Sequence, residues 1–534
     1  MFKNRSSILL LTSLLLCGCG VSPSPVDPEV EELEIYNVTI NGVMNGTKEV
    51  SIINPIEGET FSYSYSGDSI RIDENGVIYS YRGGTQTEVN VTSSLNRTGK
   101  FVVNVLNRTY NSTHKTAEES EGWFNEVNVN KVASMTSSFV NGIDISSMKQ
   151  LYDNGARFYN KEGKETFLPL LLKDNGVNWA RLRLWVEPYD TYVENGETKI
   201  FQYGGGNCDL EHVLWMAKEC KLSGLKVLLN FHYSDFWTDP SNQIIPKAWK
   251  DISTVSELAS TLKAYTKNTL LEFKNNNCLP DAVALGNEIY SGLFAHNPGT
   301  TVSTTPRGDA PYYQTDRSER TDGTQAKYDH SGNKNTQVNS NLRTYLKAAN
   351  DAVKEVSSSI PTMVHYVRGF TDPNDSIKFF TMIDDLGIDI YALSAYVYYH
   401  FQNASTLKTG LTTIANAFPN KKICIAETSY GFTFEADEWA RNTFTSDSSA
   451  TCKPVSSYEP NIQGQANLIH DVSEIVSDLA NGWGVFYWEG AWTPTKKSGW
   501  ADAISRVSWA NQALVSYNGK ALGSLEVYKK MLGN

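Results

Sequence analysis

Eight short apolar segments that alternate with amphipathic segments constrain the fold of this chain more than any other feature. Each apolar segment has the length of a strand, and several amphipathic runs end in Gly, which commonly stops a helix. The predicted strands span 141–146, 178–186, 225–234, 282–289, 361–367, 388–396, 421–430 and 483–492. Eight strand–helix units predict a (β/α)8 barrel. A doubly wound sheet is the alternative, which the regular count of eight disfavours.

The region before the barrel has a different pattern and predicts a separate all-β domain. Residues 31–110 hold short segments with alternating apolar residues, separated by Gly, Asn and Asp, as in a small β-sandwich. The segments "SIRIDENGVIYS", "GTQTEVNVTS" and "GKFVVNVLN" resemble those of bacterial immunoglobulin-like domains. Residues 111–138 are polar and acidic and predict a linker. The barrel domain then covers residues 139–534.

Residues 1–18 predict a lipoprotein signal peptide. Two basic residues precede an apolar run that is too short to span a bilayer, which is typical of a signal peptide. The following "LCGC", residues 16–19, resembles a bacterial lipobox in which Cys19 would carry the lipid. Residues 19–30 would form a Pro-rich tether. The protein would then be lipid-anchored in the bacterial cell envelope, on the periplasmic or the outer face. A plain secretory signal with chance cysteines is the alternative.

Charge and cysteine content disfavour several classes of function. The net charge is −12 and the isoelectric point is near 5.3. A nucleic-acid partner or a polybasic membrane patch would require clustered Lys and Arg, so neither is expected. A neutral substrate is compatible with this charge. The five cysteines beyond the signal have neither zinc-site nor Cys-x-x-Cys spacing, and no metal site is predicted from them.

Two carboxylates close strands of the predicted barrel and indicate its chemistry. Glu288 follows the apolar part of "AVALGNEI", and Glu427 follows that of "KKICIAET". The C-terminal ends of barrel strands meet at one mouth, so the two side chains should face each other. Paired carboxylates flanked by aromatic residues, without a metal cluster, indicate glycoside hydrolysis. One acid would protonate the leaving oxygen, while the other would act as nucleophile or as base for water. A salt bridge at the barrel rim is the alternative for either residue.

The same region resembles glycoside hydrolase family 53, the endo-β-1,4-galactanases of clan A. The motifs that carry the resemblance extend over nearly the whole barrel and include "NGIDISSMKQLYDNGARFY", "LLKDNGVNWARLRLWVEPYD", "NFHYSDFWTDP", "LGNEIYSGL", "IAETSYG", "FYWEGAW" and "SWANQAL". The resemblance implies a retaining, endo-acting enzyme that cleaves β-1,4-galactosidic bonds in pectic galactan and arabinogalactan side chains. It implies a polysaccharide substrate and no required cofactor.

The resemblance also implies roles for individual residues. Glu288 would be the general acid/base, and Glu427 would be the nucleophile that forms a covalent glycosyl-enzyme. Asn287 would bind the 2-hydroxyl of the sugar beside the break, and Arg183 would keep Glu427 ionised. Core packing is the rival explanation for the remaining residues expected at the site, which are His232, Asp235, Trp237, Tyr396 and Trp488.

The chain departs from the family pattern around the expected cleft. Val397 and Tyr399 stand where the family usually has Pro and Trp, and the long polar segment 292–336 replaces a shorter family loop. These changes leave two alternatives open: the same mechanism on another β-linked glycan, or a non-catalytic glycan-binding lipoprotein. Some family members bind calcium after the seventh strand. The acids of "EADEW", residues 435–439, make a structural calcium a further candidate.

Overall fold

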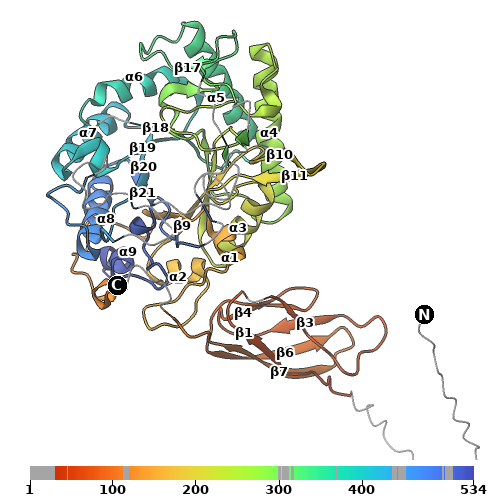
Figure 1. The fold of residues 1–534 in the computed structure, drawn as a ribbon. Coiled ribbons are helices and arrows are strands. Elements are labelled where there is room, and N and C mark those ends of the chain that lie inside the picture. Colours follow the sequence, from red (N-terminus) through yellow and green to blue (C-terminus); the bar gives the residue numbers. More distant parts are fainter. Residues whose placement is uncertain are drawn as a thin grey trace, which may run out of the picture.

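A computed structural model describes residues 31–533 except 45, 112–118, 299–301, 304–311, 314–317, 368–369, 436–441, 443–452, 496–497 and 500–508. It contains a closed barrel and a smaller β-rich domain beside it (Figure 1). No helix in the described part of the chain is long and apolar enough to span a bilayer. The predicted signal peptide, its lipidated Cys19 and the tether fall on residues 1–30, which lie outside the described residues.

The barrel is closed by eight parallel strands in the order β12-β13-β18-β19-β20-β21-β8-β9. In chain order they are β8 Val140–Asp144, β9 Trp179–Leu184, β12 Lys226–Phe231, β13 Ala282–Leu285, β18 Thr362–Tyr366, β19 Ile390–Ser394, β20 Lys422–Thr428 and β21 Gly482–Tyr487. The last strand, β21, pairs with the first, β8, and closes the sheet. Each strand overlaps a predicted one, so the (β/α)8 barrel is confirmed and the doubly wound sheet is excluded.

Helices surround the barrel and cover the outer side of its strands (Figure 1). They are α1 Met148–Asp153, α2 Leu168–Asp174, α3 Leu210–Leu222, α4 Val255–Asn275, α5 Gln337–Val356, α6 Pro373–Ile383, α7 Ala404–Ala417, α8 Ile462–Ser477 and α9 Val527–Leu532. Side-chain caps fix several helix starts: Asp209 caps α3, Thr254 caps α4 and Asn461 caps α8. Each cap accepts a hydrogen bond from a backbone N–H of the first turn that has no partner within the helix.

Alternate strand residues fill the interior of the barrel. Trp179, Leu228, Met363 and Phe486 belong to a buried cluster that is separate from the core between strands and helices. Side chains alternate between the two faces of a strand, so every second residue of β9 points inward. Trp179 is therefore followed on the inner face by Arg181 and Arg183, which bring positive charge to the C-terminal mouth of the barrel.

Short two-stranded sheets extend the loops at the C-terminal mouth. They are β10 Tyr189–Glu194 with β11 Glu197–Gln202, β14 Gly292–Leu293 with β17 Ala326–Lys327, and β15 Val302–Ser303 with β16 Tyr312–Tyr313. The first follows β9 and the other two follow β13. These last two sheets belong to the long segment after β13, residues 292–336, where the sequence departs from the pattern of the family that it resembles.

The N-terminal domain consists of two sheets around a shared core. One sheet has the order β1-β7-β6-β3 and the other has the order β2-β5-β4. The strands are β1 Val38–Asn41, β2 Lys48–Glu49, β3 Phe61–Ser64, β4 Ile70–Ile72, β5 Val77–Ser80, β6 Thr85–Ser93 and β7 Thr98–Leu106. Ile78 of one sheet and Phe101 of the other lie in the same buried cluster. The likeness of this domain to bacterial immunoglobulin-like domains stays a prediction.

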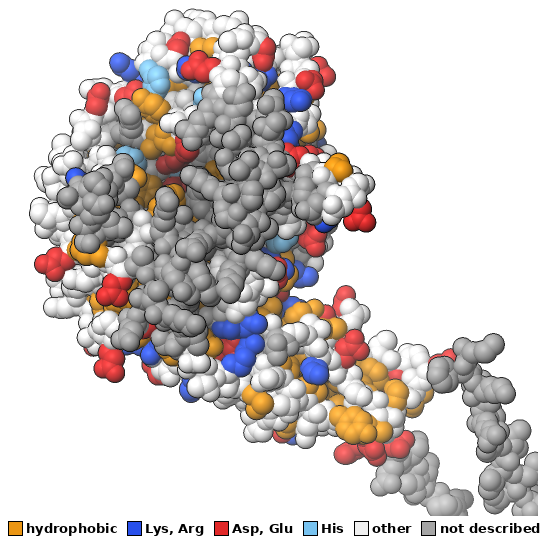
Figure 2. Space-filling model, in the orientation of Figure 1, with side chains coloured by type: hydrophobic (Ala, Val, Ile, Leu, Met, Phe, Trp, Pro, Cys, Tyr) orange, Lys and Arg blue, Asp and Glu red, His pale blue; other side chains and the backbone are white. Residues whose placement is uncertain are grey.

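The two domains meet at a buried interface. The Tyr81 ring lies 5.0 Å from that of Phe167 in the barrel domain. Its hydroxyl donates a 2.7 Å hydrogen bond to Glu219 of α3, and Arg71 lies 3.4 Å from the same carboxylate. Figure 2 shows Lys and Arg side chains gathered where the domains meet. The interface therefore combines apolar packing with a buried ion pair.

Part of the segment expected to be a linker belongs to the barrel core. Trp123, Val127, Val132 and Met135 are buried in the main cluster of the barrel domain. The Trp123 ring packs edge-on against that of Phe432, with centroids 4.9 Å apart. These apolar residues are irregularly spaced among polar ones, so no strand or helix period marks them in the sequence.

Candidate active site

A cavity of about 240 Å³ lies at the C-terminal mouth of the barrel. Eight of the nine residues expected at the site line it: Glu288, Glu427, Asn287, Arg183, His232, Trp237, Tyr396 and Trp488. They come from the ends of β9, β12, β13, β19, β20 and β21 or from the residues just after them. The ends of six strands thus converge on one cavity, as the barrel predicts.

Glu288 lies just beyond the end of β13 and is 9% exposed. Its φ angle of 46° places it in the left-handed region, which turns the chain sharply and leaves the side chain facing the cavity. The Ser394 hydroxyl of β19 donates a 2.5 Å hydrogen bond to its Oε1. Burial raises the pKa of Glu288 well above its ordinary value, and the negative charge of Glu427 raises it further. Glu288 is therefore the carboxyl group of the pair that retains its proton.

Glu427 lies near the end of β20 and accepts two hydrogen bonds from charged or polar groups. Arg181 Nη2 donates one of 2.8 Å, and the Tyr396 hydroxyl donates another of 2.8 Å. Burial raises the pKa of Glu427, whereas Arg181 and Tyr396 act in the opposite direction by stabilising its charge. Of the two carboxylates, Glu427 is the better suited to remain ionised.

Arg181, and not Arg183, is the residue that neutralises Glu427. The Arg181 guanidinium also donates a 2.6 Å hydrogen bond to Asp144 and one of 2.7 Å to Asn287 Oδ1. The prediction that Arg183 keeps Glu427 ionised is wrong in this respect. Both arginines lie on the inner face of β9, two residues apart, and their alternation does not reveal which one reaches β20.

Arg183 belongs to a second buried ion-pair group beside the first. Its Nη1 lies 2.5 Å from Glu489 Oε1 and 3.4 Å from Asp144 Oδ1. Its guanidinium lies 4.2 Å from the centre of the Trp237 ring. Glu489 accepts a 2.8 Å hydrogen bond from Ser147, and burial raises its pKa to about 7. Arg183 thus orients Trp237 in the cavity wall and links it to Glu489.

The amide of Asn287 is held in one orientation by its neighbours. Its Oδ1 accepts hydrogen bonds from Arg181, at 2.7 Å, and from Asn230 Nδ2, at 3.0 Å. Its Nδ2 donates one of 2.9 Å to the Thr238 carbonyl. An amide nitrogen has two N–H groups, so this geometry leaves the second N–H for a hydroxyl in the cavity.

His232 and two tryptophans complete the cavity wall. The Thr238 hydroxyl lies 2.9 Å from His232 Nδ1, and burial lowers the pKa of His232 well below its ordinary value, which keeps it neutral. The rings of Trp237 and Trp488 lie 6.0 Å apart and form a continuous apolar surface. Such a surface suits the apolar face of a sugar ring.

Asp235 does not line the cavity, unlike the other residues expected at the site. It accepts backbone hydrogen bonds from Glu187, at 3.0 Å, and from Lys247, at 2.7 Å. It therefore holds two loops of the mouth together. The prediction of a substrate-binding role for Asp235 is replaced by this supporting one.

Sequence reasoning missed several polar residues that orient the site. His365 of β18 lies 2.9 Å from the Ser394 hydroxyl and 3.2 Å from Asn287 Oδ1, and so connects three strands. Asp144 of β8 pairs with Arg181. All of these residues are polar positions near the C-terminal ends of apolar strands. That signal could have identified them together with Glu288.

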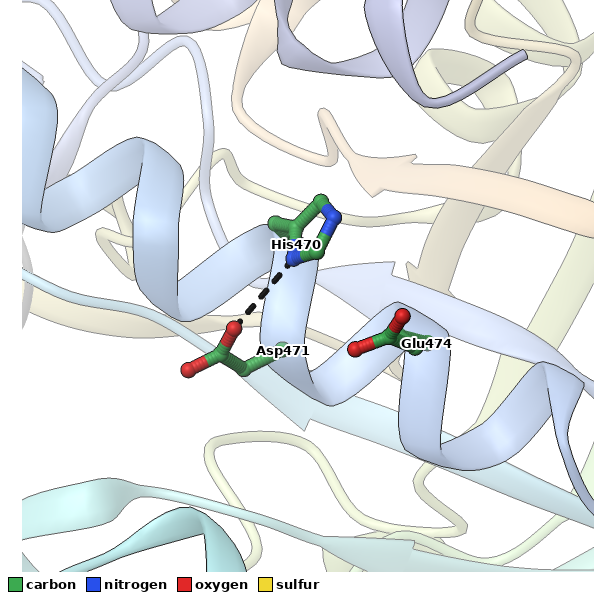
Figure 3. A group of neighbouring side chains, drawn as sticks. All are labelled: His470, Asp471 and Glu474. Carbon is green, nitrogen blue, oxygen red and sulfur yellow. Dashed lines mark hydrogen bonds and ion pairs between the residues drawn. The ribbon is translucent and has the colours of Figure 1, made fainter. Parts of the chain in front are cut away.

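One candidate metal-binding group occurs among the described residues, and it lies on α8 outside the cavity. His470, Asp471 and Glu474 have potential ligand atoms within 4.8 Å of one another (Figure 3). Asp471 already accepts hydrogen bonds from the Tyr458 hydroxyl, at 2.8 Å, and pairs with His470, at 3.2 Å. The residues 436–439 of the predicted calcium loop lie outside the described residues, so that calcium site stays a prediction.

The closed barrel and its buried pair of carboxylates define the class of protein. A proton-retaining carboxyl group and a carboxylate whose charge Arg181 and Tyr396 stabilise share one cavity with an aromatic wall, which is the arrangement of a glycoside hydrolase. Residues 140–528 match the model for glycosyl hydrolase family 53, and the chain belongs to this family.

Curated relatives and a solved structure agree with this assignment. The endo-β-1,4-galactanase of Bacillus subtilis (strain 168) is 31% identical over 437 residues, which cover 75% of this chain and 88% of the relative. The arabinogalactan endo-β-1,4-galactanase of Thermothelomyces thermophilus is 28% identical, with 73% and 98% covered. The solved GH53 catalytic domain of Ignisphaera aggregans is 33% identical, with 76% and 99% covered and a TM-score of 0.62.

Proposed function

We propose that the protein is a retaining endo-β-1,4-galactanase that cleaves galactosidic bonds in pectic galactan and arabinogalactan side chains. The observation that carries the proposal is the unequal environment of the two carboxylates: Glu427 accepts hydrogen bonds from Arg181 and Tyr396, whereas Glu288 accepts one from Ser394. Different environments of this kind separate an acid from a nucleophile. The galactan substrate is supported by family membership and by relatives that are named as galactanases.

The residues suggest a double displacement. The Glu427 carboxylate attacks the anomeric carbon while Glu288 gives its proton to the glycosidic oxygen, so the C–O bond breaks and a glycosyl-enzyme forms. Glu288, now ionised, takes a proton from water, whose oxygen attacks the anomeric carbon and releases Glu427. The second N–H of Asn287 would bind the sugar 2-hydroxyl, a contact that strengthens in the transition state. This chemistry uses two carboxylates and water and requires no cofactor.

Hydrolysis of a polysaccharide panel by the wild type and by Glu427→Gln tests the function. The wild type should release oligosaccharides from β-1,4-galactan, and the first product observed by NMR should have the β configuration. Glu427→Gln should lose at least about 10³-fold in kcat because the nucleophile is gone. Glu272→Gln, on the exposed side of α4, is the matched control and should keep full activity. An α-configured first product would remove Glu427 from the nucleophile role.

A different β-linked glycan remains the second candidate substrate. Val397 and Tyr399, which depart from the family pattern, follow β19 directly, and Tyr399 lines the cavity. The same panel decides between the candidates. Cleavage of another β-glycan with no action on galactan would favour the second, and binding without cleavage of any glycan would favour a non-catalytic role.

We also propose that the mature chain is lipid-anchored at Cys19 in the bacterial cell envelope. The "LCGC" sequence after an apolar run supports this localisation. Cells that express the wild type in the presence of labelled palmitate should yield a labelled protein in the membrane fraction. Cys19→Ser should be unlabelled, and Cys17→Ser should still be labelled. Equal labelling of wild type and Cys19→Ser would contradict the anchor.

A further inference from the structure

A second, larger cavity adjoins the one that holds the catalytic pair. Its volume is about 780 Å³, against about 240 Å³ for the first. The two cavities share Glu288, Tyr396 and Tyr399 as lining residues. Glu427 lines the smaller cavity and is absent from the described lining of the larger one. Of the catalytic pair, only Glu288 lines the larger cavity, so this cavity opens beside the acid.

The position of Glu288 determines what this cavity receives. In a retaining glycosidase, the sugar that becomes covalently bound lies over the nucleophile, and the acid protonates the oxygen of the departing part. Glu288 lines both cavities whereas Glu427 lines only the smaller one, so the part of the substrate beyond the broken bond extends into the larger one. Its volume falls in the usual range for a ligand site. This step rests on the proposed function.

The walls of the larger cavity come from four segments of the barrel mouth, which follow β12, β13, β18 and β19. Tyr290 and His330 belong to the segment after β13, and their rings lie 4.5 Å apart. Asp375, in the first turn of α6, accepts a 2.9 Å hydrogen bond from the Tyr366 hydroxyl and lies 3.6 Å from His330. The Tyr399 side chain after β19 is 57% exposed and offers a flat ring beside Glu288.

Two carboxylates give the cavity its charge. Asp372, at the start of α6, and Asp375 line it together with the protonated Glu288 and the imidazoles of His330 and His400, and none of the described lining residues is Lys or Arg. Carboxylates accept hydrogen bonds from sugar hydroxyls and repel a second carboxylate at short range. We propose that Asp372 and Asp375 restrict the departing sugar units in this cavity to uncharged sugars.

Two charge-differing substrates test this proposal. β-1,4-Galactotetraose is converted at its reducing end either to the neutral alditol or to the anionic aldonate, so that both end units are open-chain and differ in charge. At pH 7, the wild type should cleave the alditol with a kcat/KM about tenfold higher than the aldonate. Mass spectrometry of the products identifies the bond that is cleaved in each.

The variants decide whether the two carboxylates cause this preference. Asp372→Asn/Asp375→Asn should reduce the preference to about threefold or less. An amide side chain at position 372 can still cap α6. One at position 375 can still accept the hydrogen bond from Tyr366, so both substitutions should preserve the fold. Asp372→Asn alone, at an exposed position, should give an intermediate value. Asp351→Asn, on the exposed side of α5 where it pairs with Lys347, is the matched control and should keep the full preference.

Failure of this inference can be told apart from failure of the proposed function. If the wild type cleaves β-1,4-galactan but treats alditol and aldonate alike, the charge selection by this cavity is overturned and the function stands. An unchanged preference in the double variant would likewise overturn the role of Asp372 and Asp375. If the wild type cleaves neither galactan nor either tetraose derivative, both proposals fall.

Discussion

At the scale of single residues, the catalytic acid should make the protein less stable as the pH rises. Burial and the charge of Glu427 raise the pKa of Glu288 in the folded state, whereas the unfolded chain has the ordinary value near 4.3. Between these values the unfolded state binds fewer protons than the folded state, so stability falls with rising pH. At a pH below its pKa in the unfolded chain, Glu288 is protonated in both states and causes no loss of stability.

Glu288→Gln should therefore be more thermostable than the wild type, and increasingly so from pH 4 to pH 7. The gain is about 1.4 kcal/mol for each unit by which the pKa is raised, while catalysis is lost. Melting temperatures of both proteins across this range test the expectation. Glu272→Gln, at an exposed position on α4, is the control and should change stability by less than about 0.5 kcal/mol. If the melting temperatures of Glu288→Gln and the wild type differed by the same amount at every pH, the site would not raise the pKa of Glu288.

The placement of the catalytic pair could be predicted from the sequence because both residues directly follow apolar strands. The arginine that pairs with Glu427 could not be predicted from the sequence, because Arg181 and Arg183 occupy equivalent inward positions of β9. Which of them reaches β20 depends on their heights in the barrel and on the competing Glu489, and these are three-dimensional properties. Asp235 was misassigned for a related reason: its neighbours in sequence line the cavity, but its own side chain binds loop backbone.

At the scale of elements, closure of the barrel depends on a small residue in its first strand. Gly142 of β8 pairs with Phe486 of β21, and a Cβ at position 142 would lie 2.2 Å from the Phe486 ring. Gly142→Ala should destabilise the protein by about 1–3 kcal/mol because the interior is closely packed. Chemical denaturation measures the loss. Gly323→Ala, where a Cβ would meet nothing within 4 Å, should change stability by less than about 0.5 kcal/mol. Equal stabilities of the two variants would contradict this account.

The strands of the barrel could be predicted from the sequence, whereas the packing of the segment before them could not. The eight strands were recognisable because each is a short apolar run followed by a helix with the usual end signals. The packing of Trp123 and Val132 on the barrel could not be predicted, because Trp123 lies in a single 3-10 turn, Glu121–Phe124, and Val132 lies in no helix or strand, so neither has an apolar period around it. Their burial depends on surfaces that form only once the barrel is closed.

At the scale of the whole molecule, the interface between the N-terminal domain and the barrel should make them unfold together. Val43 and Tyr81 of the N-terminal domain are buried in the same cluster as the barrel core. Arg71 and Tyr81 also hold the Glu219 carboxylate, whose burial raises its pKa. Domains that share a buried core and a buried ion pair lose both when either one unfolds, so a single calorimetric transition is expected.

Tyr81→Ala should separate this transition into two. The substitution removes the contact with Phe167 and one hydrogen bond to Glu219, at a cost of about 3–5 kcal/mol. The N-terminal domain should then melt first, while galactan hydrolysis persists, because none of the described residues that line the catalytic cavity lies in 31–110. Lys100→Ala, which breaks an exposed pair with Glu88, should leave one transition. If Tyr81→Ala still melts in one transition at the wild-type temperature, Tyr81 does not couple the domains. If the wild type itself melts in two transitions, the interface does not couple them at all, and the N-terminal domain is only a spacer attached to the barrel.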